Sequence, residues 1–108
     1  MIFNGAVPTS QQVIYTVPPP TGGLTKSGNN QEFNFFRVVN NAAVMRTLNI
    51  YLNVNGVARL ITPKALQLPP GAAWDDVPIF QMAMTNTIEM LTDGDDVTWT
   101  LNVYTLPA

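Results

Sequence analysis

The chain has 108 residues, of which 46% are hydrophobic and only 11% are charged, and it contains neither histidine nor cysteine. One domain with a single core fits this length, while the charged fraction is less than half of the usual value of about 25%. Without imidazole and thiol groups the chain cannot form the usual catalytic pairing of a nucleophile with a histidine base. It also cannot form a metal site with thiolate ligands. We therefore expect no enzymatic activity and no cofactor.

Charge also limits the partners that the chain can have. The net charge is −2 and the five basic residues are scattered, which argues against nucleic acid. No apolar run approaches the roughly 20 residues that cross a bilayer, so we expect no membrane contact. A soluble monomer normally carries many charges, so a surface of Thr and Asn predicts that much of it lies against other protein.

Residues 1–11 are predicted to form an extended N-terminal arm, and residues 12–108 to form the folded domain. The arm begins with Met1, Ile2 and Phe3, which are apolar enough to need a pocket. Either the domain's own flank or a neighbouring subunit could supply that pocket.

The next two predicted strands differ in their apolar patterns. The strand at about 12–17 ends at three consecutive prolines, which cannot donate ladder hydrogen bonds. A loop rich in Pro, Gly and Asn follows, over residues 18–31. The strand at about 32–40 has apolar residues on both faces, which indicates a central strand or one with its second face in an interface.

Residues 46–54 alternate apolar and polar side chains and run into Asn55-Gly56, which is typical of a half-buried strand that ends in a tight hairpin. A two-residue loop would place Arg59 beside Leu52 on the buried face. A three-residue loop with Gly56 as the αL residue of a G1 bulge keeps Arg59 outside. We predict the bulged hairpin.

The last third of the chain alternates again. From residue 79 to residue 91 the pattern predicts two short strands or one kinked strand, and a final strand is expected at 96–106. Between them, Asp93-Gly94-Asp95-Asp96 superficially resembles a calcium loop, but it lacks the flanking helices and the closing Glu of an EF-hand. We interpret it as a hairpin turn, and Glu89 as an outward strand residue rather than a catalytic carboxylate.

Aromatic residues supply the remaining candidates. Trp99 alternates in phase with Val97 and is predicted to lie in the core. Trp74 falls in a loop flanked by Pro and Gly, where large aromatics are favoured interface anchors; a lid over the open end of the sandwich is the alternative. Tyr51 and Tyr104 occupy outward strand positions. The predicted interface residues are therefore Met1, Ile2, Phe3, Tyr51, Trp74 and Tyr104.

The turn punctuation resembles that of small structural proteins of tailed bacteriophages. The segments that carry the resemblance are Tyr15-Thr16-Val17-Pro18, Phe36-Arg37-Val38-Val39-Asn40-Asn41, the strand 47–54, Leu68-Pro69-Pro70-Gly71 and Asp93-Gly94-Asp95. The resemblance implies a capsid decoration, or cement, protein that binds the major capsid protein or other virion proteins. It would be made in the host cytoplasm, located in the virion, and homo-oligomeric, with a trimer favoured. A tail- or fibre-associated module, including one that binds carbohydrate for host adhesion, is the alternative.

For the fold we expect a single-domain antiparallel β-sandwich, similar to a jelly roll, with about seven strands.

Overall fold

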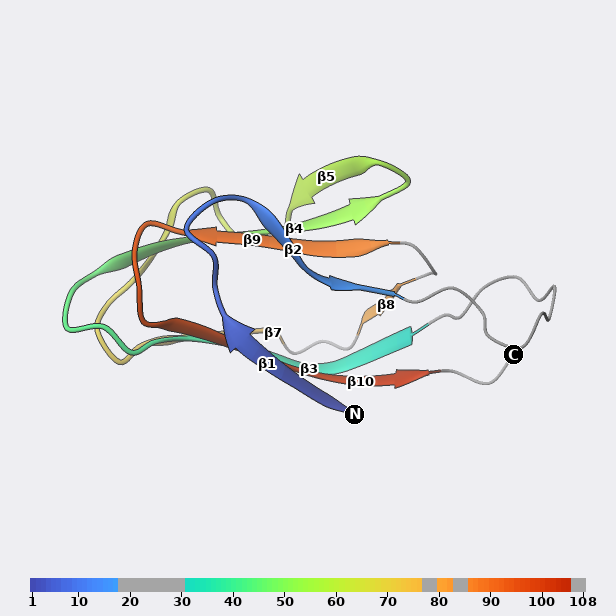
Figure 1. The fold of residues 1–108 in the computed structure, drawn as a ribbon, viewed down its shortest axis with the longest axis horizontal. Coiled ribbons are helices and arrows are strands. Elements are labelled where there is room, and N and C mark those ends of the chain that lie inside the picture. Colours follow the sequence, from blue (N-terminus) through green and yellow to red (C-terminus); the bar gives the residue numbers. More distant parts are fainter. Residues whose placement is uncertain (18–30, 77–79, 83–85, 106–108) are drawn as a thin grey trace, which may run out of the picture.

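The computed structural model describes residues 1–17, 31–76, 80–82 and 86–105, and their regular secondary structure is entirely β. The strands, in chain order, are β1 (Ile2–Ala6), β2 (Gln12–Thr16), β3 (Gln31–Asn40), β4 (Arg46–Val54), β5 (Val57–Leu60), β6 (Leu66–Leu68), β7 (Ala73–Asp76), β8 (Phe80–Met82), β9 (Thr87–Thr92) and β10 (Val97–Thr105). They form two facing layers (Figure 1). The prediction of an all-β sandwich is confirmed.

The strand order is that of a jelly roll. Sheet A has the order β1-β10-β3-β7, with β8 also paired to β3, and sheet B has the order β2-β9-β4-β5, with β6 also paired to β4. The antiparallel partners nest, because β1 pairs with β10, β2 with β9, β3 with β7 and β4 with β5. Such nesting is what results when one long hairpin is folded across two sheets. The expected number of strands was too low, since β5 and β6 share one position of this pattern and β7 and β8 share another.

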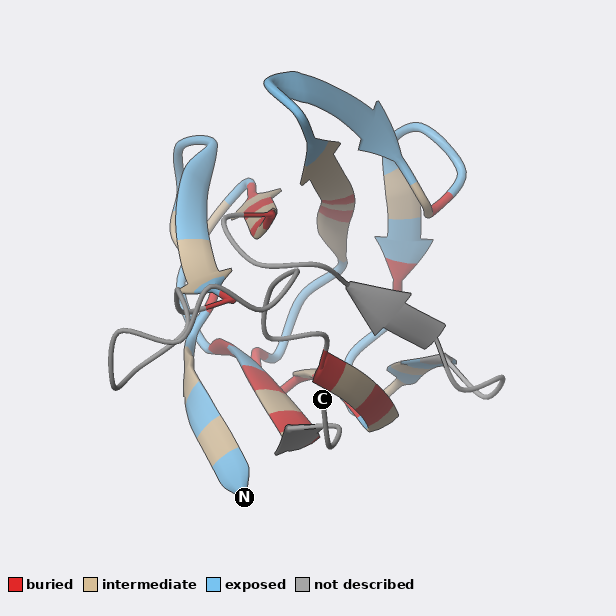
Figure 2. Cartoon of the chain, turned by 90° about the vertical axis from the view of Figure 1, so that its right-hand side faces the viewer, coloured by how far each residue is buried: buried red, intermediate tan, exposed pale blue. Residues whose placement is uncertain are grey.

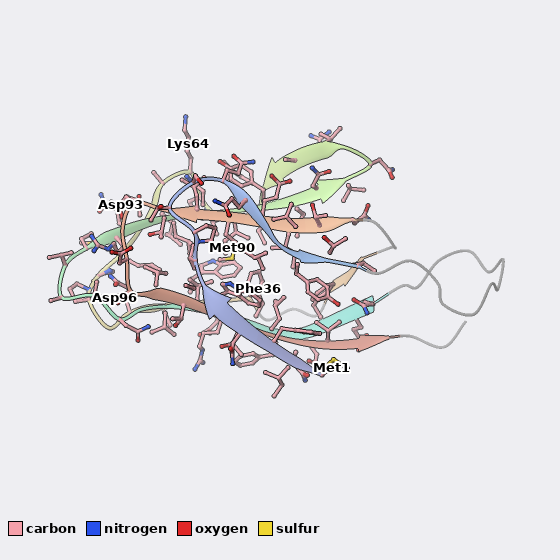
Figure 3. All side chains as sticks on the ribbon, in the orientation of Figure 1. Met1, Phe36, Lys64, Met90, Asp93 and Asp96 are labelled. Atoms are coloured by element: carbon pink, nitrogen blue, oxygen red, sulfur yellow. The ribbon has the colours of Figure 1, made fainter. Side chains whose placement is uncertain are left out.

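The core lies between the sheets and follows the predicted alternation. In β10 the buried residues are Val97, Trp99, Leu101 and Val103, and in β9 they include Ile88 and Met90. Trp99 is therefore a core residue, as predicted. Figure 2 shows buried residues in both layers, and in Figure 3 the labelled Met90 of sheet B and Phe36 of sheet A lie between the layers.

A β-bulge explains why β3 is apolar on both faces. The pairing with β10 shifts between Asn102, which faces Phe35, and Val103, which faces Phe33. Asn34 is the extra residue, so the inward phase changes along the strand and both Phe33 and Phe36 are buried, at 1% exposure each. The strand lies between β10 and β7, as expected for a central strand.

The structure corrects the prediction of a separate N-terminal arm. Residues 2–6 form β1, which pairs with β10 of the same chain over five residues. Gly5 allows close contact with the core, since a Cβ atom there would meet the Trp99 indole at 3.2 Å. The ring of Phe3 lies 5.2 Å from that of Tyr15 in β2. The domain's own flank thus provides the pocket for Phe3.

The hairpin prediction was wrong. Asn55 and Gly56 form a two-residue loop, because Val54 pairs with Val57 and Leu52 pairs with Arg59. Both loop residues have positive φ, 53° for Asn55 and 83° for Gly56, as a type I′ turn requires. Arg59 needs no bulge to avoid burial, since all four residues of β5 are exposed.

The segment at residues 93–96 also differs from its prediction. It is a turn, but it connects β9 of sheet B to β10 of sheet A and is therefore a crossover between layers rather than a hairpin. Asp96 adopts a φ of 68° within it. Asp93 and Asp96 lie at one end of the sandwich in Figure 3.

Candidate interaction surface

The outward side of sheet A presents three cross-strand rows of side chains. The register of β1, β10, β3 and β7 aligns their outward positions. We call this surface outer face A, and its rows are Ile2, Asn102 and Phe35; Asn4, Thr100, Arg37 and Asp75; and Ala6, Thr98, Val39 and Ala73. Small neutral and apolar side chains make up most of it.

The only charges within these three rows neutralise each other. Arg37 forms an ion pair with Asp75, its cross-strand partner, and its Cζ atom lies 5.4 Å from the centre of the Phe35 ring. Hydrogen bonding to the carboxylate of Asp75 raises the pKa of Arg37 above its ordinary value. The side chains of the three rows therefore carry no net charge. The exposed apolar residues Ile2 and Phe35 flank Asn102 at one end, where the Met1 ammonium donates a hydrogen bond to Asn102 Oδ1 at 3.2 Å.

The outward side of sheet B is organised around Glu89. Its Oε1 accepts a hydrogen bond from Gln11 Nε2 at 3.0 Å, and its Oε2 accepts one from Asn53 Nδ2 at 2.9 Å. The neighbours of Glu89 across the strands are Val13 and Tyr51. Both carboxylate oxygens are thus held by neutral amides, an arrangement that fits a structural strand residue and offers no second carboxylate for acid–base chemistry.

The predicted interface residues do not share one surface. Met1 and Ile2 stand at the start of β1, 75% and 67% exposed, next to or within outer face A. Phe3 points inward, whereas Tyr51 lies half-buried on the outward side of sheet B.

Trp74 is not in a loop. It lies in β7, opposite Val38, and is half-buried. Its ring meets that of Phe36 edge-on, with centroids 5.3 Å apart. This position resembles the predicted lid more than an exposed anchor. For Tyr104 the backbone pairs with Glu32, and its side chain lies outside the described parts of the structure.

Sequence reasoning missed Phe35 and the Arg37–Asp75 pair. Regular alternation from Phe33 would place Phe35 inside, and only the bulge at Asn34 turns it outward, to 37% exposure. The adjacent pair Phe35-Phe36 carries a usable signal, because consecutive strand residues point to opposite faces, so one of the two must face away from the core.

The acidic turn at residues 93–96 already has partners. Asp93 Oδ1 accepts a hydrogen bond from Thr47 N at 3.1 Å, and Arg46 Nε donates one to Asp95 O at 3.1 Å. The Arg46 guanidinium lies against Gly94, where a Cβ atom would meet its Cζ at 2.5 Å. Over the described ranges, no cluster of three or more acidic residues is placed to hold a metal ion.

Within those same ranges, the structure contains no helix with the length and apolar character needed to cross a membrane. Comparison of the chain with protein-family models, with curated proteins and with solved structures gives no match. The interpretation of its surfaces therefore rests on their own chemistry.

Proposed function

We propose that this chain is a non-enzymatic structural protein of a phage particle, and that it attaches to a repeating protein shell through outer face A. The observation that carries the proposal is the chemistry of that face. Its three rows span four strands and contain a single, internally neutralised ion pair beside exposed Ile2 and Phe35. Depletion of net charge with retention of apolar side chains is the composition found at the centres of protein interfaces.

The fold is compatible with this proposal but is equally compatible with other functions. Jelly rolls occur in viral capsid domains, but also in lectins and cupins, and a fold by itself does not specify a function. The surface chemistry supports the proposal, together with a turn pattern that resembles that of small phage structural proteins. Capsid decoration is the leading role, and attachment to the tail is the alternative.

A carbohydrate-binding role receives less support from the described aromatic residues. Sugar recognition by stacking needs an accessible aromatic face. Trp99 is 7% exposed, while Trp74 and Tyr51 are half-buried and belong to different sheets. A docking role has no such requirement, since a sheet face whose side chains carry no net charge is sufficient for contact with protein.

The test uses particles produced from the genome that encodes the chain. Immunolabelling in the electron microscope should place the protein on the capsid, in many copies. Labelling at the tail would support the alternative role, and a chain found wholly outside the particle fraction would overturn both.

A matched pair of variants tests the surface itself. Ala73→Glu adds a charge to outer face A, and Ala58→Glu adds the same charge to an exposed position of β5 in sheet B. We expect the first variant to lower particle occupancy by about tenfold, because a charge added to a neutral contact surface must be desolvated on binding. The second should bind like the wild type. Equal occupancy by both variants would contradict a role for outer face A.

A further inference from the structure

The outer edge of β1 has backbone groups free to pair with another strand. Val103 N donates to Met1 O at 2.8 Å and Val7 N donates to Val97 O at 2.8 Å, so residues in the phase of Met1 and Val7 direct their backbone groups toward β10. The residues between them direct their backbone N–H and C=O groups away from β10, because the two orientations alternate along an antiparallel strand. They are Ile2, Asn4 and Ala6, and all three are exposed. No second strand flanks β1 within the described sheet.

The other long edges carry features that oppose strand addition. The pairing of β2 is broken by a bulge at Ile14, β5 contains Arg59, and β7 contains Asp75. Bulges and charges of this kind are common devices against edge pairing. In β1 there is no charge, no proline and no register shift. Its neighbour β10 is also uncharged.

We propose that two copies of this chain join edge to edge through β1, in antiparallel orientation, about a two-fold axis at Asn4. This register pairs Asn4 with Asn4 of the second copy, and Ile2 with Ala6 of the second copy. The backbone N–H and C=O groups of Ile2, Asn4 and Ala6 in each strand then have hydrogen-bond partners. Pro8 has no N–H group, and it ends the pairing edge at Ala6.

The symmetry of the edge favours a second copy as the occupant. Three pairing positions centred on Asn4 map onto themselves under a two-fold rotation, and an isologous contact needs such a self-complementary pattern. A charged residue at the centre would face its own copy and repel it, and the central residue here is neutral. Joining the edges also makes outer face A continuous across both copies, although the pair itself does not depend on binding to a particle.

The contact is small. Five residues of edge strand bury far less than the roughly 800 Å² per partner of a standard interface. We therefore expect a weak dimer that is observed at high protein concentration, and the measurement is sedimentation equilibrium of the full chain up to about 1 mM.

Charged substitutions of Asn4, which lies on the two-fold axis, test the proposed register of the two β1 strands. Asn4→Lys and Asn4→Asp should each raise the dimer dissociation constant by about tenfold, because like charges then face each other directly. An equimolar mixture of the two variants should dimerise at least as well as the wild type. Ala73→Lys, which places the same charge on the same face at the far edge of the sheet, is the control and should leave the dimer unchanged.

Circular dichroism of each variant checks that the fold is kept; Asn4 is exposed and is not part of the hydrophobic core. A monomer at all concentrations, a trimer, or a mixture of the Asn4 variants that stays monomeric would overturn the proposal. Because the measurement contains no particles, its failure would leave the proposed attachment through outer face A standing.

Discussion

Asn40 Nδ2 donates a hydrogen bond to the backbone oxygen of Leu68 at 2.8 Å, and so connects β3 of sheet A to β6 of sheet B. The same nitrogen donates to Val44 O at 2.9 Å, and Oδ1 accepts from Ala42 N at 2.9 Å. The side chain is fully buried, at 0% exposure. Its amide thus satisfies three backbone groups at the end of the sandwich where the chain crosses between sheets.

Replacing this amide should destabilise the fold strongly. Asn40→Ala leaves two carbonyl oxygens and one N–H without their partner, and we expect a loss of about 2–4 kcal/mol in the free energy of unfolding, measured by urea denaturation. Asn41→Ala is the control, because its hydrogen bond to Thr98 is exposed, and it should cost less than about 1 kcal/mol. Equal effects of the two substitutions would contradict the linking role of Asn40.

Neighbouring residues of β1 should respond in opposite ways. Phe3 packs against the core whereas Ile2 is 67% exposed. In dilute protein, Phe3→Ala should lower stability by about 1.5–3 kcal/mol through lost apolar burial, and Ile2→Ala by less than about 0.5 kcal/mol. Thermal melts measure both. If Phe3→Ala melted like the wild type, β1 would not be an integral part of the sandwich.

The type I′ turn makes Gly56 sensitive to substitution. A β-branched residue at its φ of 83° is strained, so Gly56→Val should cost about 1–2 kcal/mol, or roughly 4–16 °C in melting temperature. Nothing lies within 4 Å of the position that a Cβ atom would occupy, so the cost comes from the backbone alone. Asn55→Gly, which keeps positive φ accessible, should melt within about 2 °C of the wild type. A Gly56→Val protein as stable as Asn55→Gly would contradict the turn.

Stability should fall at alkaline pH through Tyr15. Burial raises the pKa of Tyr15 above its ordinary value of 10.0, so the folded state favours the neutral phenol. The resulting stability is complete below about pH 10 and decreases as the pH rises through the folded-state pKa, because the unfolded state loses its proton first.

Tyr15→Phe isolates this contribution. The phenol donates a hydrogen bond to Gln31 Oε1, so the variant should be about 1 kcal/mol less stable near neutral pH. Above about pH 10 the difference from the wild type should shrink, as only the wild type loses stability by ionising this ring. Urea midpoints of both proteins measure it, and a constant difference across this range would contradict the expectation.

Calcium should not stabilise the protein. Asp93 and the backbone of Asp95 are already engaged with Thr47 and Arg46, and the Arg46 guanidinium occupies the space beside Gly94. Addition of about 5 mM calcium exceeds the dissociation constants of weak calcium modules, yet the melting temperature should stay unchanged, with or without a chelator. A reproducible rise would show that these residues bind the ion.

Much of the fold follows from two-residue alternation. In β9 and β10 the apolar residues on the predicted face are buried, and so are Leu48 and Ile50 in β4, because a strand with one buried face must alternate. Val54, at the hairpin end of β4, belongs to the same face but is 44% exposed. The hairpin prediction was wrong because it assumed that the residues of β5 face the core. The bulged hairpin was chosen to keep Arg59 out of the core, but β5 extends beyond the core and its four residues are exposed. The pairing of distant segments, such as β1 with β10, could not be predicted, because no local sequence pattern encodes it.

The candidate surface was less predictable than the fold. An outward surface is defined by cross-strand register, and the register of β3 depends on the bulge at Asn34. Without it, the proximity of Ile2, Asn102 and Phe35 cannot be derived from their positions in the chain. The expectation of a neutral, protein-facing surface came from composition alone, whereas its location required the sheet.

The nested strand order has a consequence for how the chain folds during synthesis. β10 lies between β1 and β3, and Ile2 finds its partner at Asn102. Sheet A therefore lacks an inner strand until β10 has been synthesised, and β1 stays unpaired until then. Contacts so distant in sequence make folding slow, on the millisecond to second scale, and expose strand edges meanwhile. Because β1 carries no charge to keep it apart from other nascent chains, the yield of folded protein should fall as its rate of synthesis rises.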